Sequence, residues 1–147
     1  MNYKLGIGVG LMIYKNQKVL LGLRNKDSKK ASSDLHGEGT WTFPGGKLDF
    51  GESIYNCAKR ELREETNLDL LTCKVICINN NIVKEAQYIT FGILVNKFKG
   101  KIKTMEKDEI TEWKWFRLNK LPKNLYSPTK KIIDMYKKKR FFNIKEK

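Results

Sequence analysis

The sequence predicts an α+β fold whose elements follow the order strands, helix, strands, helix. Apolar residues alternate with glycine near the amino terminus, which is the two-residue period of a strand. Between residues 53 and 67 the apolar residues instead recur every four positions, which is the period of a helix. Segments rich in Ile, Val, Thr, Tyr and Phe then return before a second amphipathic stretch at about residues 128–139.

Length and composition indicate a single domain over residues 1–147. A chain of 147 residues is long enough to bury a sizeable core, and 40% hydrophobic with 31% charged residues is typical of a globular protein. The apolar run from Leu5 to Tyr14 is too short to cross a bilayer, and no small-residue cleavage site follows it. We therefore expect neither a signal peptide nor a membrane partner.

Leu5 to Tyr14 is predicted to form the first strand. Four apolar side chains alternate with three glycines along it: Ile7, Val9, Leu11 and Ile13 against Gly6, Gly8 and Gly10. The bare glycine face lets a ligand or another element approach closely. Such a run resembles a dinucleotide-binding fingerprint, but that motif must be followed by a helix. Here a turn at residues 15–17 leads into a second strand, Lys18 to Arg24, so we reject that interpretation.

A long loop is expected over residues 25–40. Its length suits a segment that faces a substrate better than it suits a simple connection. The loop holds the single histidine of the chain, His36, which we interpret as a residue at the solvent or at the edge of a substrate. One histidine cannot build a zinc site, and no Ser or Cys partner accompanies it.

The next helix is predicted to carry the chemistry. Before it, residues 41–46 end an apolar run with one proline and two glycines, a turn that lets backbone amides and carbonyls approach a ligand. Ser53 is expected to cap the helix, and Asn67 to end it in the left-handed conformation that asparagine tolerates. A stripe formed by Ile54, Ala58 and Leu62 is expected to pack on the core. The adjacent stripe, with Glu61 and Glu65, then faces a cleft.

Three glutamates share one face of this helix. Glu61 lies beside Glu64 and Glu65, and like charges at this spacing destabilise a helix by roughly 0.2–0.5 kcal/mol per pair. A bound divalent cation would remove that repulsion. Carboxylate oxygens suit Mg2+ or Mn2+, whereas no cluster of His or Cys favours zinc. The alternative is a solvated charged helix that binds nothing.

The segment from Gly46 to Leu68 resembles the signature of the Nudix hydrolases. That signature is glycine, five residues, glutamate, seven residues, and then Arg-Glu-apolar-any-Glu-Glu-any-Gly-apolar. Eight positions match: Gly46, Glu52, Arg60, Glu61, Leu62, Glu64, Glu65 and Leu68. Asn67 replaces the family's glycine, a departure that concerns helix termination and little of the chemistry. The resemblance implies an α/β/α sandwich with a mixed β-sheet and flanking helices.

The resemblance also implies an activity and roles for the matching residues. The expected activity is that of a pyrophosphohydrolase, in which Mg2+ or Mn2+ neutralises the diphosphate of a nucleoside diphosphate linked to another group. The implied metal ligands are Glu61 and Glu65, then Glu64, with Glu52 and the carbonyl of Gly46 as accessory ligands. Arg60 is expected to brace a carboxylate of the motif, and the alternative is a plain surface arginine.

An acidic loop late in the chain is expected to supply the general base. It holds Glu106, Asp108, Glu109 and Glu112 ahead of a tryptophan-containing strand. By resemblance Glu109 is the candidate, although a solvated loop explains four acids equally well.

Candidate substrate contacts come from the turn and the strands around it. Arg24 and Lys47 resemble phosphate-contacting positions, and the turn adds Phe43, Gly45 and Gly46. Phe43, Tyr88 and Phe91 are candidates for stacking on a base, although an aromatic residue on a strand is more often part of the core.

Within the family the chain resembles the small MutT-type nucleoside triphosphate pyrophosphohydrolases, including those that act on oxidised nucleotides such as 8-oxo-dGTP. The expected reaction converts a (deoxy)nucleoside triphosphate to its monophosphate and pyrophosphate. ADP-ribose and other nucleotide sugars are less favoured, because residues 82–85 hold no proline where ADP-ribose enzymes often carry one. Hydrolysis of RNA 5' ends, including decapping, and a catalytically silent nucleotide-binding module remain alternatives.

The remaining segments complete the predicted fold. Three further strands are expected at Leu70–Asn79, Gln87–Phe98 and Glu112–Leu118. Ser127 is expected to cap the last helix, with Pro128 at its first position, and residues 140–147 are expected to be loosely held.

Charge and cysteine usage suggest partners and a location. A net charge of +14 raises the capture rate of anionic nucleotides. RNA is a less favoured partner, because the run from Lys137 to Arg140 before Phe141 and Phe142 is not accompanied by a nucleic-acid module. Cys57, Cys73 and Cys77 are expected to be buried reduced thiols, which favours a cytoplasmic location. The oligomeric state is left open between monomer and homodimer.

Overall fold

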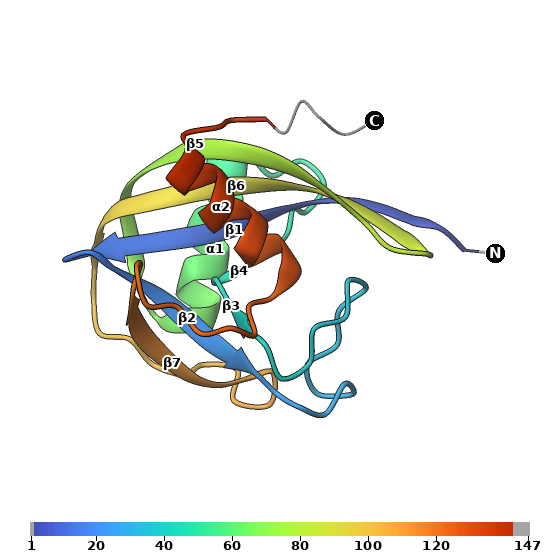
Figure 1. Cartoon of the computed structure of the whole chain (residues 1–147), viewed down its shortest axis with the longest axis horizontal. Helices are drawn as coiled ribbons and strands as arrows, with labels where there is room; N and C mark the ends of the chain where they lie inside the picture. Colours follow the sequence, from blue (N-terminus) through green and yellow to red (C-terminus); the bar gives the residue numbers. More distant parts are fainter. Residues whose placement is uncertain (1, 143–147) are drawn as a thin grey trace.

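The computed structural model describes residues 2–142 (Figure 1). In this part of the chain seven strands form a mixed sheet and two helices flank it. The elements are β1 (Lys4–Lys15), β2 (Lys18–Arg24), β3 (Trp41–Thr42), β4 (Gly45–Lys47), α1 (Ile54–Thr66), β5 (Asp69–Ile82), β6 (Ala86–Lys99), β7 (Ile110–Arg117) and α2 (Ser127–Lys138).

The long first strand joins the two halves of the sheet. The strand order is β3-β2-β1-β6-β5, with β4 paired to β1 and β7 paired to β2. β1 and β6 run parallel over ten residue pairs, from Lys4 opposite Ala86 to Ile13 opposite Val95, whereas the other pairs are antiparallel. The stretch Gly8 to Gly10 pairs with β4 on the other edge of β1. This pairing brings the turn before α1 to the middle of the sheet.

The two helices cover opposite faces of the sheet (Figure 1). Val9, Leu11 and Ile13 of β1 pack with Ala58 and Leu62 of α1 in one core cluster. Side chains of the opposite parity face α2, where Met12 shares a second cluster with Ile132 and Ile133. The predicted α+β fold and its α/β/α sandwich are therefore confirmed.

The glycines of β1 allow one of these helices to approach the sheet closely. A Cβ atom at Gly10 would lie 2.5 Å from Cδ1 of Ile132 in α2. Gly6 is covered in the same way by the ring of Tyr88, whose Cε1 would lie 2.4 Å from an added Cβ. The bare glycine face therefore receives a partner element, as the sequence suggested, and Gly8 and Gly10 also line the cavity described below.

The predicted strands are present, with ends that differ from the prediction by at most three residues. Two strands were not predicted, β3 and β4, because they have two and three residues and owe their extended form to pairing with β2 and β1. The predicted cap of the last helix is wrong. Ser127 is the first residue of α2, and Tyr126 occupies the cap position without a side-chain hydrogen bond.

The segment after α2 is attached to the sheet where the structure describes it. The amide of Ile78 in β5 donates to the carbonyl of Phe141 at 2.9 Å, and Phe142 forms a parallel bridge with Ile78. The prediction of a loosely held end is therefore wrong for residues 140–142, and its remainder, residues 143–147, lies outside the described residues.

The three cysteines carry free thiols. Cys57 and Cys77 are buried as predicted, and burial raises their pKa values to about 12 and about 11. Cys73 is only half-buried. In residues 2–142 neither helix has the length and apolar character needed to cross a membrane. The cytoplasmic location stays a prediction.

Candidate active site

The turn before α1 and the helix itself hold the acidic side chains in place. The hydroxyl of Ser53 accepts a hydrogen bond from the amide of Asn56, and Asn67 ends the helix in the left-handed conformation with φ of 65°. Both predicted caps are confirmed. The buried stripe of Ala58 and Leu62 fixes the rotation of α1, so the glutamates of its adjacent stripe face outward from the core.

An open cavity of about 580 Å³ lies beside this helix. Its wall includes Glu61, Glu64 and Glu65 of α1, the backbone of Gly45 and Gly46, and the first half of β1. The acidic loop before β7 and the long loop before β3 complete the wall. The structure therefore brings the three helical glutamates to one cavity, as their spacing indicated.

Arg60 is the centre of the ion pairs around these glutamates. Its Nε and Nη2 donate to Oε2 and Oε1 of Glu52 at 2.7 and 2.9 Å, and its Nη1 donates to Glu61 at 2.8 Å and to Glu64 at 3.3 Å. Its hydrogen bonds hold the pKa of Glu52 at about 2. Glu52 also accepts from the amide of Asp49 and does not line the cavity. Arg60 therefore braces Glu61 and Glu64, and Glu52 holds Arg60 in place. Glu52 itself is not part of the cavity wall.

Glu65 is the most buried of the acidic groups. Its exposed fraction is 8%, and burial together with the charge of Glu61 raises its pKa well above the usual range for a glutamate. One hydrogen bond opposes this shift, because the amide of Gly45 donates to Oε1 of Glu65 at 3.1 Å. Burial also raises the pKa of Glu61, against the opposing charge of Arg60. Arg60 therefore only partly offsets the burial of Glu61, and among residues 2–142 no ion pair compensates Glu65.

The two glycines of the turn are required by how closely other groups approach them. A Cβ at Gly46 would lie 2.4 Å from Oε1 of Glu61, and a Cβ at Gly45 would lie 2.0 Å from the carbonyl oxygen of Val9. The backbone of the turn is therefore pressed between β1 and the carboxylates of α1.

The donor set of this cavity fits a hard divalent cation. Glu61, Glu64 and Glu65 supply oxygen ligands, and a cation beside the buried Glu65 would supply the missing positive charge. Across residues 2–142, however, no three His, Cys, Asp or Glu side chains already stand together as a ligand group, and Arg60 holds two of the glutamates. Mg2+ keeps several waters and takes substrate phosphates as ligands, so one or two carboxylates are sufficient.

The acidic loop faces this helix across the cavity. Glu106 and Glu109 both line the wall, whereas Asp108 and Glu112 do not. Burial and a hydrogen bond with Glu109 raise the pKa of Glu106 to about 7. Sequence reasoning chose Glu109 and passed over Glu106, because four acids in seven residues carry no sign of which ones turn inward.

Comparison with known proteins agrees with this geometry. The family model of the NUDIX domain matches residues 4–136, which is most of the chain. The chain belongs to the NUDIX family. The Nudix resemblance drawn from the signature residues is thereby confirmed, and proteins of this family generally use divalent metal ions.

Among similar proteins, an oxidized purine nucleoside triphosphate hydrolase of Danio rerio is 29% identical over 114 residues, covering 76% of this chain and 66% of that protein. An RNA pyrophosphohydrolase of Bartonella bacilliformis is 25% identical over 145 residues, covering 78% and 79%. The crystal structure of a MutT NUDIX hydrolase from Burkholderia pseudomallei superposes with a TM-score of 0.79 at 25% identity, covering 89% and 97%. These relatives support a MutT-type Nudix protein and the predicted class of enzyme, a hydrolase of phosphoric anhydrides.

A residue that sequence reasoning missed organises one side of the Nudix cavity. Asp34, in the long loop, accepts from Lys4 at 2.9 Å, from Lys47 at 3.0 Å and from the hydroxyl of Tyr88. The Tyr88 hydrogen bond and the two lysines lower the pKa of Asp34. The Lys47 ammonium also stands 5.3 Å from the centroid of the Tyr88 ring. No periodicity marks Asp34 in the sequence, since its partners come from three separate strands.

The other predicted substrate contacts differ in how they face the cavity. Arg24 is 5% exposed, and it donates to the carbonyls of Gly37 and Ala31 at 3.1 and 2.7 Å, so two of its donors hold the long loop. Phe43 reaches the wall, but its ring belongs to the second core cluster. Tyr88 lines the cavity, whereas Phe91 packs on the first core cluster and His36 is exposed away from the wall.

Proposed function

We propose that this Nudix protein is a divalent-metal-dependent pyrophosphohydrolase of nucleoside triphosphates, which it converts to the monophosphate and pyrophosphate. The observation that carries the proposal is the carboxylate set of α1, Glu61, Glu64 and Glu65, facing the acidic loop across one cavity with Lys47 on its wall. Phosphoryl transfer depends chiefly on positioning and on neutralising charge, and this wall offers groups for both.

Glu61 and Glu65 are the proposed principal ligands of Mg2+ or Mn2+, with Glu64 and the Gly46 carbonyl beside them. Bound metal would neutralise the diphosphate and activate the attacking water. Arg60 positions Glu61 and Glu64 through its hydrogen bonds. Lys47 is the proposed cation for a phosphate oxygen, and Asp34 holds it over the Tyr88 ring. Arg24 contributes by fixing the loop that bears Asp34.

The proposed general base is Glu109, acting with Glu106. Both face the helical glutamates, and a pKa of about 7 at Glu106 matches the value that favours proton transfer near neutral pH.

The side of the cavity next to Asp34 is the proposed place of the nucleoside. Tyr88, Thr90 and Tyr126 line the cavity and offer aromatic surface and hydroxyl groups to a base. Oxidised purine nucleotides such as 8-oxo-dGTP are the preferred candidates, because the similar zebrafish protein is named for that substrate class. A single domain, a cytoplasmic location and a monomer or homodimer are retained as part of the proposal.

A substrate panel tests the proposal. The protein would be assayed with Mg2+ or Mn2+ against (d)NTPs, oxidised dNTPs, ADP-ribose, dinucleoside polyphosphates and 5'-triphosphate RNA, with kcat/KM compared. Metal-dependent release of pyrophosphate from triphosphates, strongest for one base, supports it. Release of pyrophosphate from 5'-triphosphate RNA at a higher kcat/KM than from nucleoside triphosphates would favour the second candidate, an RNA 5'-end pyrophosphohydrolase. The similarity to the Bartonella protein supports this candidate. Absence of turnover for every member of the panel would favour a silent binding module.

A further inference from the structure

Three cationic side chains stand next to one another at one end of the sheet. Lys15 lies directly opposite Lys18 across the β1–β2 hairpin, and Lys18 lies directly opposite Arg117 of β7. Residues directly opposite one another in a sheet point to the same face, so these three side chains share one face. We call Lys15, Lys18 and Arg117 the cationic row.

The cationic row has no internal neutralisation. Like charges directly opposite one another in a sheet are destabilising. All three side chains are exposed, and among residues 2–142 none of them forms an ion pair. The hairpin turn, with Asn16 and Gln17 at φ of 52° and 64°, fixes the register that sets the charges opposite each other. The row therefore favours a partner that carries several closely spaced negative charges.

Aromatic rings accompany these cations. The ammonium of Lys15 stands 5.8 Å from the centroid of the Phe98 ring, which stacks on Trp115 at 6.2 Å and 24°. Both rings are half-buried, so part of each reaches the surface. Cations interleaved with aromatic surface are typical of sites for single-stranded nucleic acid.

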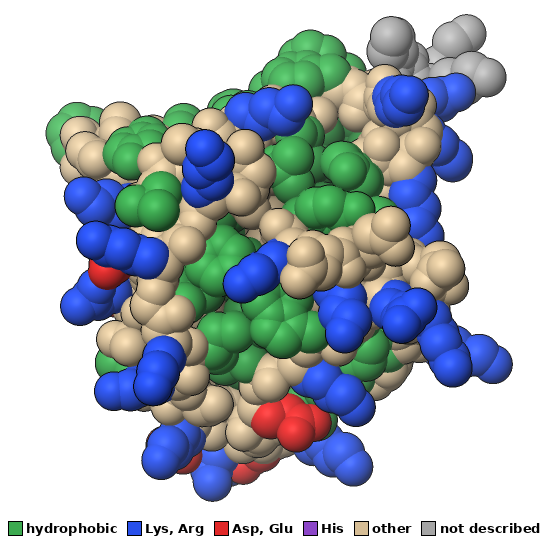
Figure 2. Space-filling view, turned by 90° about the vertical axis from the view of Figure 1, so that its left-hand side faces the viewer, with side chains coloured by type: hydrophobic (Ala, Val, Ile, Leu, Met, Phe, Trp, Pro, Cys, Tyr) green, Lys and Arg blue, Asp and Glu red, His purple; other side chains and the backbone are tan. Residues whose placement is uncertain are grey.

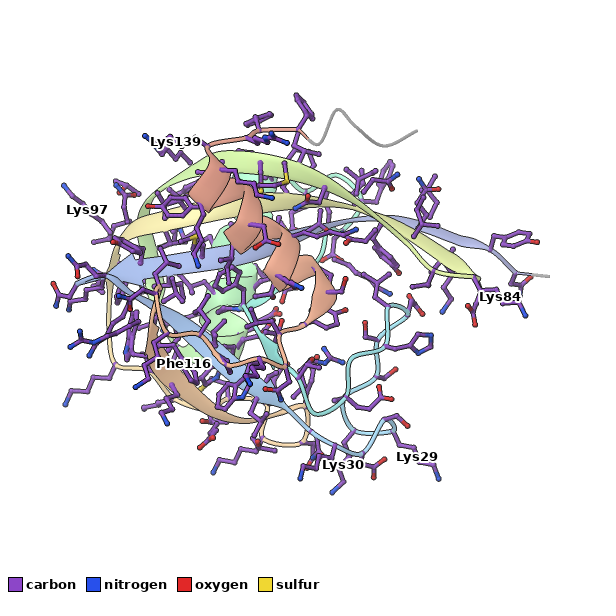
Figure 3. The ribbon with its side chains drawn as sticks, in the orientation of Figure 1. Lys29, Lys30, Lys84, Lys97, Phe116 and Lys139 are labelled. Atoms are coloured by element: carbon purple, nitrogen blue, oxygen red, sulfur yellow. The ribbon has the colours of Figure 1, made fainter. Side chains whose placement is uncertain are left out.

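Basic and acidic side chains gather on different parts of the molecule. Figure 2 shows this end of the molecule as an apolar area surrounded by Lys and Arg side chains, with few acidic ones. Lys97 and Lys139 point outward there, at the left of Figure 3, while Lys84 lies at the opposite end. The acidic groups instead gather at the cavity, where Glu61, Glu64 and Glu65 line the wall.

We propose that this end of the sheet binds single-stranded nucleic acid, with phosphates on the cationic row and bases against the exposed parts of Phe98 and Trp115. An acidic polypeptide would satisfy the cations but would leave the rings without a partner. The surface is separate from the nucleotide cavity, because Lys15 lies five residue steps along β1 from Gly10 in the cavity wall, which is about 17 Å. The inference thus goes beyond the proposed hydrolase and does not depend on it.

The test compares two charge reversals of equal size. Binding of a fluorescein-labelled 15-nucleotide oligo(U) with a 5'-hydroxyl would be measured by anisotropy in the full chain, in Lys18→Glu and in the control Lys84→Glu. We expect Lys18→Glu to weaken binding by about tenfold or more and to reduce the slope of log K against log[salt], because a carboxylate then stands between Lys15 and Arg117. Lys84→Glu, at the other end of the molecule, should have little effect.

The melting temperature and the kcat of the Lys18→Glu variant complete the test. Lys18→Glu should raise the melting temperature, since it replaces two like-charge contacts by two opposite-charge ones, so a loss of binding cannot be ascribed to unfolding. Its kcat on a nucleoside triphosphate should be unchanged. Equal weakening by both variants would reduce the effect to net charge and overturn the proposal. Competition by polyglutamate as effective as that by unlabelled oligo(U) would also overturn it, in favour of an acidic protein partner.

Discussion

The guanidinium of Arg60 holds both carboxylate oxygens of Glu52, with Nε 2.7 Å from Oε2 and Nη2 2.9 Å from Oε1. The pair links the segment before α1, which holds Glu52, to the second turn of the helix, which holds Arg60. The remaining nitrogen of Arg60 donates to Glu61 and Glu64. Arg60 therefore sets the position of Glu61 and Glu64, two of the proposed metal ligands. This relation makes the brace testable apart from the carboxylates.

Arg60→Lys should lower kcat/KM by about 10- to 100-fold, because lysine cannot make the paired contacts that orient the carboxylates. The melting temperature should change little by comparison. Arg63→Lys is the matched control on the same helix, since Arg63 pairs with Asp69 away from the cavity. Equal losses of activity in the two variants would remove the bracing role.

Glu65→Gln should lower kcat by orders of magnitude if Glu65 holds the metal. It should also raise the melting temperature of the metal-free protein at neutral pH, because the neutral amide avoids burying a charge next to Glu61. Glu64→Gln is the control for stability, since its side chain is 49% exposed and should shift the melting temperature less. Turnover near that of the wild type in Glu65→Gln would exclude this glutamate from the metal site.

Gly46→Ala should displace the carboxylate of Glu61, since the added methyl group would lie 2.4 Å from its Oε1. A displacement of about 1 Å at a positioned catalytic group costs about 100-fold in kcat/KM. Gly51→Ala serves as the control, because an added Cβ there meets nothing within 4 Å and the variant carries only the backbone strain of a φ of +80°, about 1–2 kcal/mol. Gly51→Ala should therefore lose stability and keep its activity.

The stability of the metal-free protein should fall as the pH rises. Glu65 has a folded-state pKa well above its unfolded value, and Glu106 has one of about 7, so both bind protons more tightly in the folded state. Their stabilising effect is complete below about pH 4.5 and is lost progressively up to and beyond pH 7. Thermal melts between pH 5 and 8 measure the loss. It should be smaller in Glu65→Gln and should be reversed by Mg2+ with a nucleotide.

The cysteines should differ in reactivity in an order set by burial. Cys57 and Cys77 are buried with pKa values of about 12 and 11, so little thiolate is present at pH 8, whereas Cys73 is half-buried. A thiol-specific reagent should label Cys73 first, and Cys73→Ser should remove the fast phase. A fast phase that survives in Cys73→Ser would show that one of the buried thiols opens to solvent.

Features of the fold were predictable from the sequence where neighbouring residues determine them. Ser53, the stripe of Ala58 and Leu62, and Asn67 fix the ends and the rotation of α1 from neighbouring residues, so the helix and the face bearing Glu61 and Glu65 were predictable. The same holds for the alternating strand β1. The cap of α2 was misread, because Ser127 before a proline satisfies the pattern one residue too late.

The tertiary structure alone decided what meets in the cavity. Asp34 collects Lys4, Lys47 and Tyr88 from positions 13 to 54 residues away, and no pattern along the chain indicates such a meeting. Which acid of the late loop turns inward, and that Arg60 ties Glu52 away from the cavity wall, depend in the same way on packing between distant segments. Periodicity and helix capping depend on residues that are close in the sequence. The partners of a charged side chain depend instead on which strands and loops pack next to one another in the folded protein.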